Sequence, residues 1–289
     1  MSGNMQSFAG CRARWFAGLA LLVLLLAGAV PARADLEDGT SEGFLPPRYA
    51  RKFALHEPLY FSLGWRGGTT ARFQLSFRYR FLGADDPADR GDLLAGHLWF
   101  GYTQTSLWDI SAQSSPFRDT SYRPSLFWLK RDIGARWLGL RRVGLAAGFE
   151  HESNGRSGEF SRSLNILFVR PILVLGRTGD YTWTFSPKIY TYLGDLSDNP
   201  DIADYRGYAD LLLEVEKPDS WGVSLLARRG RRRHYGSLQL DASYPLDRLF
   251  HGRVDSYVHF QVFWGWGESL LDYDRKGPTQ VRVGLMLVR

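Results

Sequence analysis

An alternation between apolar and polar side chains runs through most of the chain and constrains the fold more than any other feature. From residue 72 the sequence reads R-F-Q-L-S-F-R-Y-R-F, with aromatic and aliphatic residues at one parity and polar residues at the other. The same period of two recurs over 209–216, 257–264 and 280–287. Because successive side chains of a strand point to opposite faces, this period predicts β-strands that are apolar on one side.

Counting such segments predicts twelve strands, an even number that lets an antiparallel sheet close into a barrel without a free edge. We expect the strands at 53–65, 70–82, 93–106, 122–131, 141–152, 163–175, 181–193, 206–216, 221–229, 234–244, 254–265 and 279–288. If both chain ends lie on the periplasmic side, the long connections 107–121, 153–162, 194–205 and 266–278 lie outside the cell. The sequence therefore predicts one all-β domain, a twelve-stranded antiparallel barrel.

Two further features favour a transmembrane barrel over a soluble β-sandwich, whose strands would alternate in the same way. The strands are about ten residues long, which is enough to cross a bilayer at a steep tilt. Their ends are rich in Tyr, Trp and Phe, as expected for aromatic girdles at the two membrane interfaces. After the N-terminal segment no run of about 18 apolar residues remains that could form a transmembrane helix.

Residues 1–34 have the pattern of a secretory signal peptide. Basic residues precede an uncharged, Leu- and Ala-rich stretch at 15–30, and the small-x-small sequence at 32–34 precedes Asp35, where cleavage is expected. Residues 35–52 should then form a periplasmic N-terminal segment, and 53–289 the barrel. Cys11 is the only cysteine, so no disulfide is expected after cleavage.

Charge gives little information on partners, apart from one basic run. The net charge of +6 is dispersed among the strands, and we expect no nucleic-acid partner. The run Arg228–Arg233 falls at an outside connection. It is either an ordinary solvated loop or a contact for the phosphates of lipopolysaccharide.

The stretch H-E-S-N-G-R-S-G-E-F-S-R-S-L-N at 151–165 places three polar side chains on the predicted lipid face. On the fifth strand, alternate apolar residues up to Phe149 should face lipid. His151 and Ser153 occupy the next two positions of the same face. On the sixth strand, Arg170 marks the lumen side, so Asn165 should face lipid, although Ile166 and Phe168 would then point inward. Polar groups on a lipid face are costly unless they pair or lie among the headgroups, and both alternatives remain open.

A pairing of these side chains would resemble the active site of a hydrolase. Serine is a weak nucleophile that needs a base, and residues two apart on a strand, such as His151 and Ser153, share a face. The base needs a third group that fixes its tautomer, and the carbonyl of Asn165 can do this. The Asn154-Gly155 turn offers backbone N–H groups for an oxyanion.

At these residues the chain resembles outer membrane phospholipase A, a twelve-stranded barrel of Gram-negative bacteria. The resemblance centres on 151–165 and extends to Y-T-Q-T-S-L-W at 102–108, S-S-P-F-R-D-T at 114–120, D-N-P-D-I at 198–202 and G-W-G-E-S-L-L-D-Y at 265–273. It departs at Leu164, where the family usually has tryptophan, and at the C-terminal Val288-Arg289, where such barrels usually end in an aromatic residue.

The resemblance implies a phospholipase A1/A2 that cleaves the sn-1 and sn-2 acyl esters of glycerophospholipids and lysophospholipids in the outer membrane. It implies Ser153 as nucleophile, His151 as base, Asn165 as the orienting residue and the Gly155 N–H as an oxyanion donor. It further implies a Ca²⁺ cofactor and a homodimer. The calcium ligands that it implies are Ser161, the backbone carbonyl of Arg156, and Ser114 from across the dimer interface. Gln104 is implied as a residue of that interface.

Two other functions compete with hydrolysis. A porin-like or structural barrel would also alternate in this way, but charged lumen positions such as Arg72, Asp210 and Glu214 could pair and fill a narrow interior. An adhesin-like or lipopolysaccharide-contacting barrel that uses the basic run Arg228–Arg233 is the other alternative.

Overall fold

The computed structural model describes residues 52–65, 69–81, 97–134, 139–176, 179–250 and 254–289. The predicted signal peptide and nearly all of the predicted periplasmic segment lie outside these residues. None of the described helices is long and apolar enough to cross a membrane.

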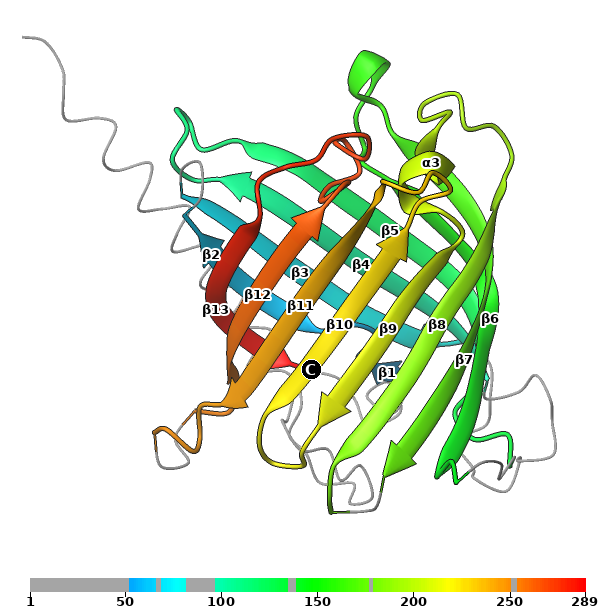
Figure 1. Cartoon of the computed structure of the whole chain (residues 1–289), viewed down its shortest axis with the longest axis vertical. Coiled ribbons are helices and arrows are strands. Elements are labelled where there is room, and N and C mark those ends of the chain that lie inside the picture. Colours follow the sequence, from blue (N-terminus) through cyan, green and yellow to red (C-terminus); the bar gives the residue numbers. More distant parts are fainter. Residues whose placement is uncertain (1–51, 66–68, 82–96, 135–138, 177–178, 251–253) are drawn as a thin grey trace, which may run out of the picture. The chain divides into compact units, whose positions relative to one another are not determined.

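Strands β2 to β13 form a closed, twelve-stranded antiparallel barrel, as predicted (Figure 1). Each strand pairs with its neighbours in the chain, and β13 pairs with β2 to close the ring. The strands are β2 Leu59–Gly64, β3 Thr70–Arg80, β4 Leu98–Asp109, β5 Phe117–Lys130, β6 Arg142–Ser153, β7 Ser163–Gly176, β8 Thr182–Leu193, β9 Ala209–Glu216, β10 Gly222–Arg229, β11 Gly236–Pro245, β12 Tyr257–Gly265 and β13 Gln280–Val288.

The first predicted strand, 53–65, is broken in the structure. Phe53–Ala54 forms the short strand β1. It pairs with Arg78 and Tyr79 of β3, whereas β2 pairs with residues 70–74 of the same strand. Pro58 lies in the gap and has no N–H to donate to the ladder. Glu57 turns into the lumen instead, where its carboxylate accepts a hydrogen bond from Arg123 at 2.6 Å. A partly buried ion pair thus replaces the missing ladder contacts.

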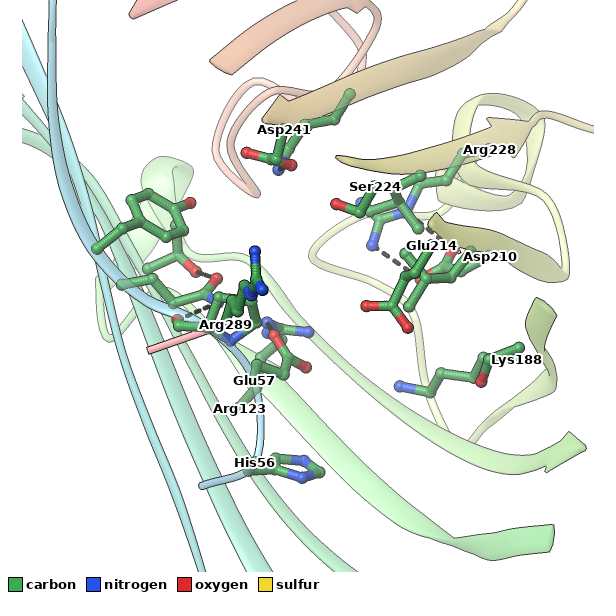
Figure 2. A pocket seen from close by; sticks show the side chains of 18 of the residues that line it. His56, Glu57, Arg123, Lys188, Asp210, Glu214, Ser224, Arg228, Asp241 and Arg289 are labelled. Atoms are coloured by element: carbon green, nitrogen blue, oxygen red, sulfur yellow. Dashed lines mark hydrogen bonds and ion pairs between the residues drawn. The ribbon is translucent and has the colours of Figure 1, made fainter. Parts of the chain in front are cut away.

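The outward faces of the strands are apolar and the lumen is charged. Leu167 and Val169 on β7 are 48% and 47% exposed, whereas Ile166 and Phe168 between them are buried. The lumen contains a cavity of about 470 Å³ with acidic and basic walls (Figure 2). Several charged side chains in the lumen are paired, which offsets the cost of their burial; examples are Lys188–Glu150 at 2.7 Å and Arg228–Asp210 at 2.8 Å.

At the outer end, loops fill the mouth of the barrel. The β12–β13 connection folds over the opening next to the short helix α3, Ile202–Arg206 (Figure 1). Its Leu270 is fully buried, and its Glu268 reaches down to Arg282 at 2.6 Å. The Tyr273 hydroxyl donates to Asp201 at 2.5 Å; burial and this bond raise the pKa of the phenol, which stays protonated. These contacts pack part of the β12–β13 connection into the outer mouth of the barrel.

Candidate active site

The residues of the predicted triad lie at the outer end of the β6–β7 hairpin. In the ladder His151 lies opposite Asn165, and Ser153 lies opposite Ser163. On β6 the exposed Phe149 lies on the same face as His151 and Ser153, because alternate residues of a strand share a face. The sequence required Ile166 and Phe168 to point inward if Asn165 faces lipid. Both side chains do point inward, where they join an apolar cluster inside the barrel.

His151 and Asn165 are joined by a hydrogen bond of 2.9 Å between Nδ1 and Oδ1. An amide oxygen only accepts, so Nδ1 carries the proton and the neutral ring presents Nε2 as an acceptor. Ser153 lies on the same strand face two residues away, the spacing that a serine needs to reach that nitrogen. Among the hydrogen bonds of the described residues there is none between the Ser153 and His151 side chains.

Gly155 follows the serine in a backbone conformation that favours glycine. Its φ is +66°, in the left-handed region. A Cβ at this position would also lie 3.1 Å from the ring of Tyr122, which is the ladder partner of Ser153 on β5. A side chain at 155 would therefore be both strained and crowded, which accounts for the glycine next to the candidate nucleophile.

Asn154 holds the loop between β6 and β7, and sequence reasoning assigned its side chain no role. This side chain is 4% exposed, accepts from the N–H groups of Arg156 at 3.2 Å and Arg162 at 3.1 Å, and donates to the carbonyl of Phe160 at 2.8 Å. Three backbone groups of one loop thus depend on one amide. The Asn-Gly pair predicts the turn but does not reveal that the asparagine points inward.

The residues expected to bind calcium are distributed over two loops. Ser161 follows a short 3₁₀ turn at Gly158–Phe160, and its hydroxyl donates to Asp198 at 2.7 Å. The guanidinium of Arg156 donates to carbonyls at the start of β5, which ties the β6–β7 loop to its neighbour. Ser114 lies in the β4–β5 loop, exposed and with φ +65°. The structure gives no contact between Ser114 and Ser161 within the described chain.

The donor types around Ser161 suit a hard cation. Hydroxyl, carbonyl and carboxylate oxygens are preferred by Ca²⁺, and Asp198 adds the negative charge that the predicted set lacked. Among the described residues no group of three or more His, Cys, Asp or Glu side chains could hold a metal ion. A calcium site here would therefore depend on hydroxyl and carbonyl oxygens. The D-N-P-D-I motif was the signal that could have identified Asp198.

Gln104 lies on the outward face of β4. Its side chain accepts from the Tyr102 hydroxyl at 3.0 Å and donates to Ser106 at 3.3 Å, and its ladder partner is Tyr122. A row of polar side chains on a lipid face is costly unless it is covered. This row also lies next to the candidate triad, because Tyr122 in turn pairs with Ser153.

A second Ser-His-Asp chain lies inside the barrel. Ser62 contacts Nδ1 of His259 at 2.8 Å, and Nε2 of His259 contacts Asp241 at 2.9 Å. Its hydrogen bonds are more complete than those of the outer group, but Ser62 and His259 are both 0% exposed. A buried serine has no access to a lipid, so this chain is a packing network that joins β2, β11 and β12.

The lumen side of β6 is anchored at the two residues that alternate with the candidate catalytic positions. Glu150 pairs with Lys188, and Glu152 accepts from Arg206 at 2.8 Å and from Ser121 at 2.7 Å. Because neighbouring residues of a strand point in opposite directions, these inward bonds hold the segment that carries His151 and Ser153 outward.

Comparison with known proteins agrees with this geometry. The family model described as Phospholipase A1 matches residues 62–287. A putative phospholipase A1 of Neisseria meningitidis serogroup B is 36% identical over 65% of this chain and 48% of that protein. Phospholipase A1 of Escherichia coli K12 is 36% identical over 75% of this chain and 68% of that protein. The chain thus spans about half the length of the first relative and about two thirds of the second.

Solved structures share the fold. Outer membrane phospholipase A from E. coli superposes with a TM-score of 0.68 at 28% identity, covering 81% of this chain and 94% of that chain. A dimer of the Salmonella typhi outer membrane phospholipase with bound calcium gives 0.68 at 27% identity, covering 86% and 94%. Another matching structure is an active-site mutant of the E. coli protein in which asparagine is replaced by alanine. The chain therefore belongs to the phospholipase A1 family, a family of ester hydrolases that are β-barrels of the outer membrane.

Proposed function

We propose that this protein hydrolyses acyl esters of glycerophospholipids and lysophospholipids, at both the sn-1 and sn-2 positions, on its outer, lipid-facing surface. The observation that carries the proposal is the His151–Asn165 hydrogen bond on the same outward face as Ser153. The active-site asparagine of the E. coli relative gives further support. A lipid-facing site suits a substrate that diffuses in the plane of the membrane.

In the proposed reaction the Ser153 hydroxyl attacks the ester carbonyl while Nε2 of His151 takes its proton. Asn165 holds the imidazole in the required tautomer and orientation. The N–H of Gly155 donates to the oxyanion. His151 then returns the proton to the leaving alcohol, and water releases the fatty acid from the serine ester in a second cycle of the same steps.

Calcium dependence and dimerisation form the finer part of the proposal. The hydroxyl of Ser161, the carbonyl of Arg156 and Ser114 from a second copy would hold the ion, with Asp198 nearby. Bound calcium would supply positive charge close to the developing oxyanion. The second copy would cover the polar row at Gln104. The Salmonella relative was solved as a dimer with calcium, which supports both points.

A porin-like or structural barrel is the alternative, and no observation favours it. Apolar and charged side chains of the β12–β13 loop fill the outer mouth among the described residues.

The test is release of labelled acyl chains from phospholipid in mixed micelles, with and without calcium. Ser153→Ala should fold normally and lose roughly five to six orders of magnitude in turnover. Ser62→Ala is the matched control, since it removes the serine of the buried chain, and it should retain turnover. Wild-type turnover in Ser153→Ala would overturn the assignment.

A further inference from the structure

The basic run at 228–233 divides into groups with different partners. Arg228 points into the lumen and bonds Asp210 through two nitrogens, at 2.8 and 2.9 Å (Figure 2). Arg231 and Arg232 both bond Asp204 of α3, at 2.7 and 2.8 Å. These three arginines are therefore occupied within the chain, and Arg231 and Arg232 hold the β10–β11 turn against the helix.

Arg229 and Arg233 remain available to an outside anion. Both are exposed, and neither forms an ion pair with any residue that the structure describes. Arg229 is the last residue of β10. Because Arg228 points inward, Arg229 points to the lipid side, at the outer end of a membrane-spanning strand.

Lys276 adds a third cation beside an exposed apolar surface. Its ammonium lies 4.8 Å from the ring centre of Trp264, which is 48% exposed on the outer end of β12. Trp264 is the ladder partner of Leu238 on β11, which is 42% exposed. Two residues before Leu238, Gly236 pairs with Arg229. Arg229 and Lys276 thus flank one apolar patch.

The backbone holds this arrangement in place. Within the turn the N–H of Gly230 bonds the carbonyl of Tyr235 at 3.0 Å, and Arg231 N–H bonds the carbonyl of Ala203 in α3 at 3.0 Å. A Cβ at Gly230 would collide with the carbonyl oxygen of Asp204. The backbone of Lys276 is bridged to Trp266. The backbone next to Arg229 and at Lys276 is therefore held before any lipid binds, which lowers the part of the entropic cost that comes from ordering the connections.

We propose that Arg229, Arg233 and Lys276 form a cationic rim that binds the phosphates of an outer-leaflet lipid with a phosphorylated sugar head, of the lipopolysaccharide class. Its acyl chains would lie over Leu238 and Trp264. Three cations on two connections match a head with more than one phosphate better than the single phosphate of a glycerophospholipid. The rim shares no residue with the proposed catalytic group, so each proposal can fail without the other.

The experiment measures lipid binding to the folded full-length barrel in detergent by native mass spectrometry. The probes are a diphosphorylated glucosamine lipid, its dephosphorylated analogue and phosphatidylglycerol, with inorganic phosphate as competitor. The rim variant carries Arg229→Gln, Arg233→Gln and Lys276→Gln. The matched control carries Arg141→Gln, Lys217→Gln and Arg248→Gln, three exposed cations near the opposite ends of the strands.

Each cation near an anionic lipid contributes about fivefold in affinity at low salt, so the rim variant should bind the diphosphorylated lipid about a hundredfold more weakly. The control should bind like the wild type, and the dephosphorylated lipid should bind weakly to all three proteins. Phosphatidylglycerol, which the proposed catalytic site can also bind, should bind equally to the rim variant and the control. Equal loss in rim and control variants would overturn the proposal. So would equal binding of the dephosphorylated lipid, or complete competition by millimolar phosphate.

Discussion

At the scale of single residues, a hydrogen-bonded chain of the right side chains does not by itself make an active site. The buried Ser62–His259–Asp241 chain is better connected than the outer group, yet its serine is closed to solvent and lipid. The outer group has one described bond, from His151 to Asn165, and lies on the outward face of the barrel. Access separates the two cases, and strand parity in the sequence predicted the outward direction of His151 and Ser153.

Replacement of Asn165 tests its orienting role. Asn165→Ala should keep about tenfold to a hundredfold more turnover than Ser153→Ala, because His151 can still accept the proton when it is less well oriented. Asn165→Asp keeps an oxygen acceptor for Nδ1 and should retain more turnover than the alanine variant. Steady-state hydrolysis of a micellar phospholipid measures both. A loss in Asn165→Ala as large as that in Ser153→Ala would mean that the asparagine does more than orient.

At the scale of the strands, alternation predicted the number of strands, and it predicted the outward face of segments such as 280–287, where Val281, Val283 and Leu285 are exposed. It failed where a lumen contact outweighs the ladder, as at Glu57, whose bond to Arg123 interrupts the first strand. It also assigned Arg228 to the outside basic run, although its partner Asp210 lies within the lumen. Such pairings join residues far apart in the chain, and a local pattern contains no information about them.

The inward anchors of β6 should determine its stability. Glu152→Gln leaves Arg206 buried without its carboxylate and should lower the free energy of unfolding by about 3 kcal/mol. Adding Arg206→Met removes the uncompensated charge and should recover most of that loss. Guanidinium unfolding of the barrel in lipid vesicles measures both, with the exposed Glu159→Gln as control. No recovery in the double variant would show that the pair is not the source of the effect.

At the scale of the whole molecule, the described chain brings most of the predicted site together and leaves one element apart. The β6–β7 hairpin carries the predicted triad, Gly155 and Ser161, whereas Ser114 lies on the β4–β5 loop and makes no described contact with them. The sequence could not show whether a second copy closes this gap, because an interface has no local signature beyond a polar residue on a lipid face, such as Gln104.

A complementation experiment tests the crossing ligand. One chain carries Ser153→Ala and the other Ser114→Leu, so each homodimer should be nearly inactive. A mixed dimer has one site with an intact nucleophile and an intact Ser114 from its partner. Mixing under exchange conditions should restore calcium-dependent turnover, up to about half that of the wild type per dimer. Heterodimers that form but stay inactive would rule out a ligand from the second copy.

Active-site labelling tests most directly whether the outward Ser153 is the nucleophile. The folded wild-type barrel is treated with a long-chain sulfonyl fluoride, and the modified peptide is identified by mass spectrometry. We predict a single adduct on Ser153 that forms faster with calcium, disappears in Ser153→Ala and persists in Ser62→Ala. Labelling that is unchanged in Ser153→Ala, or that maps to another serine, would contradict the account.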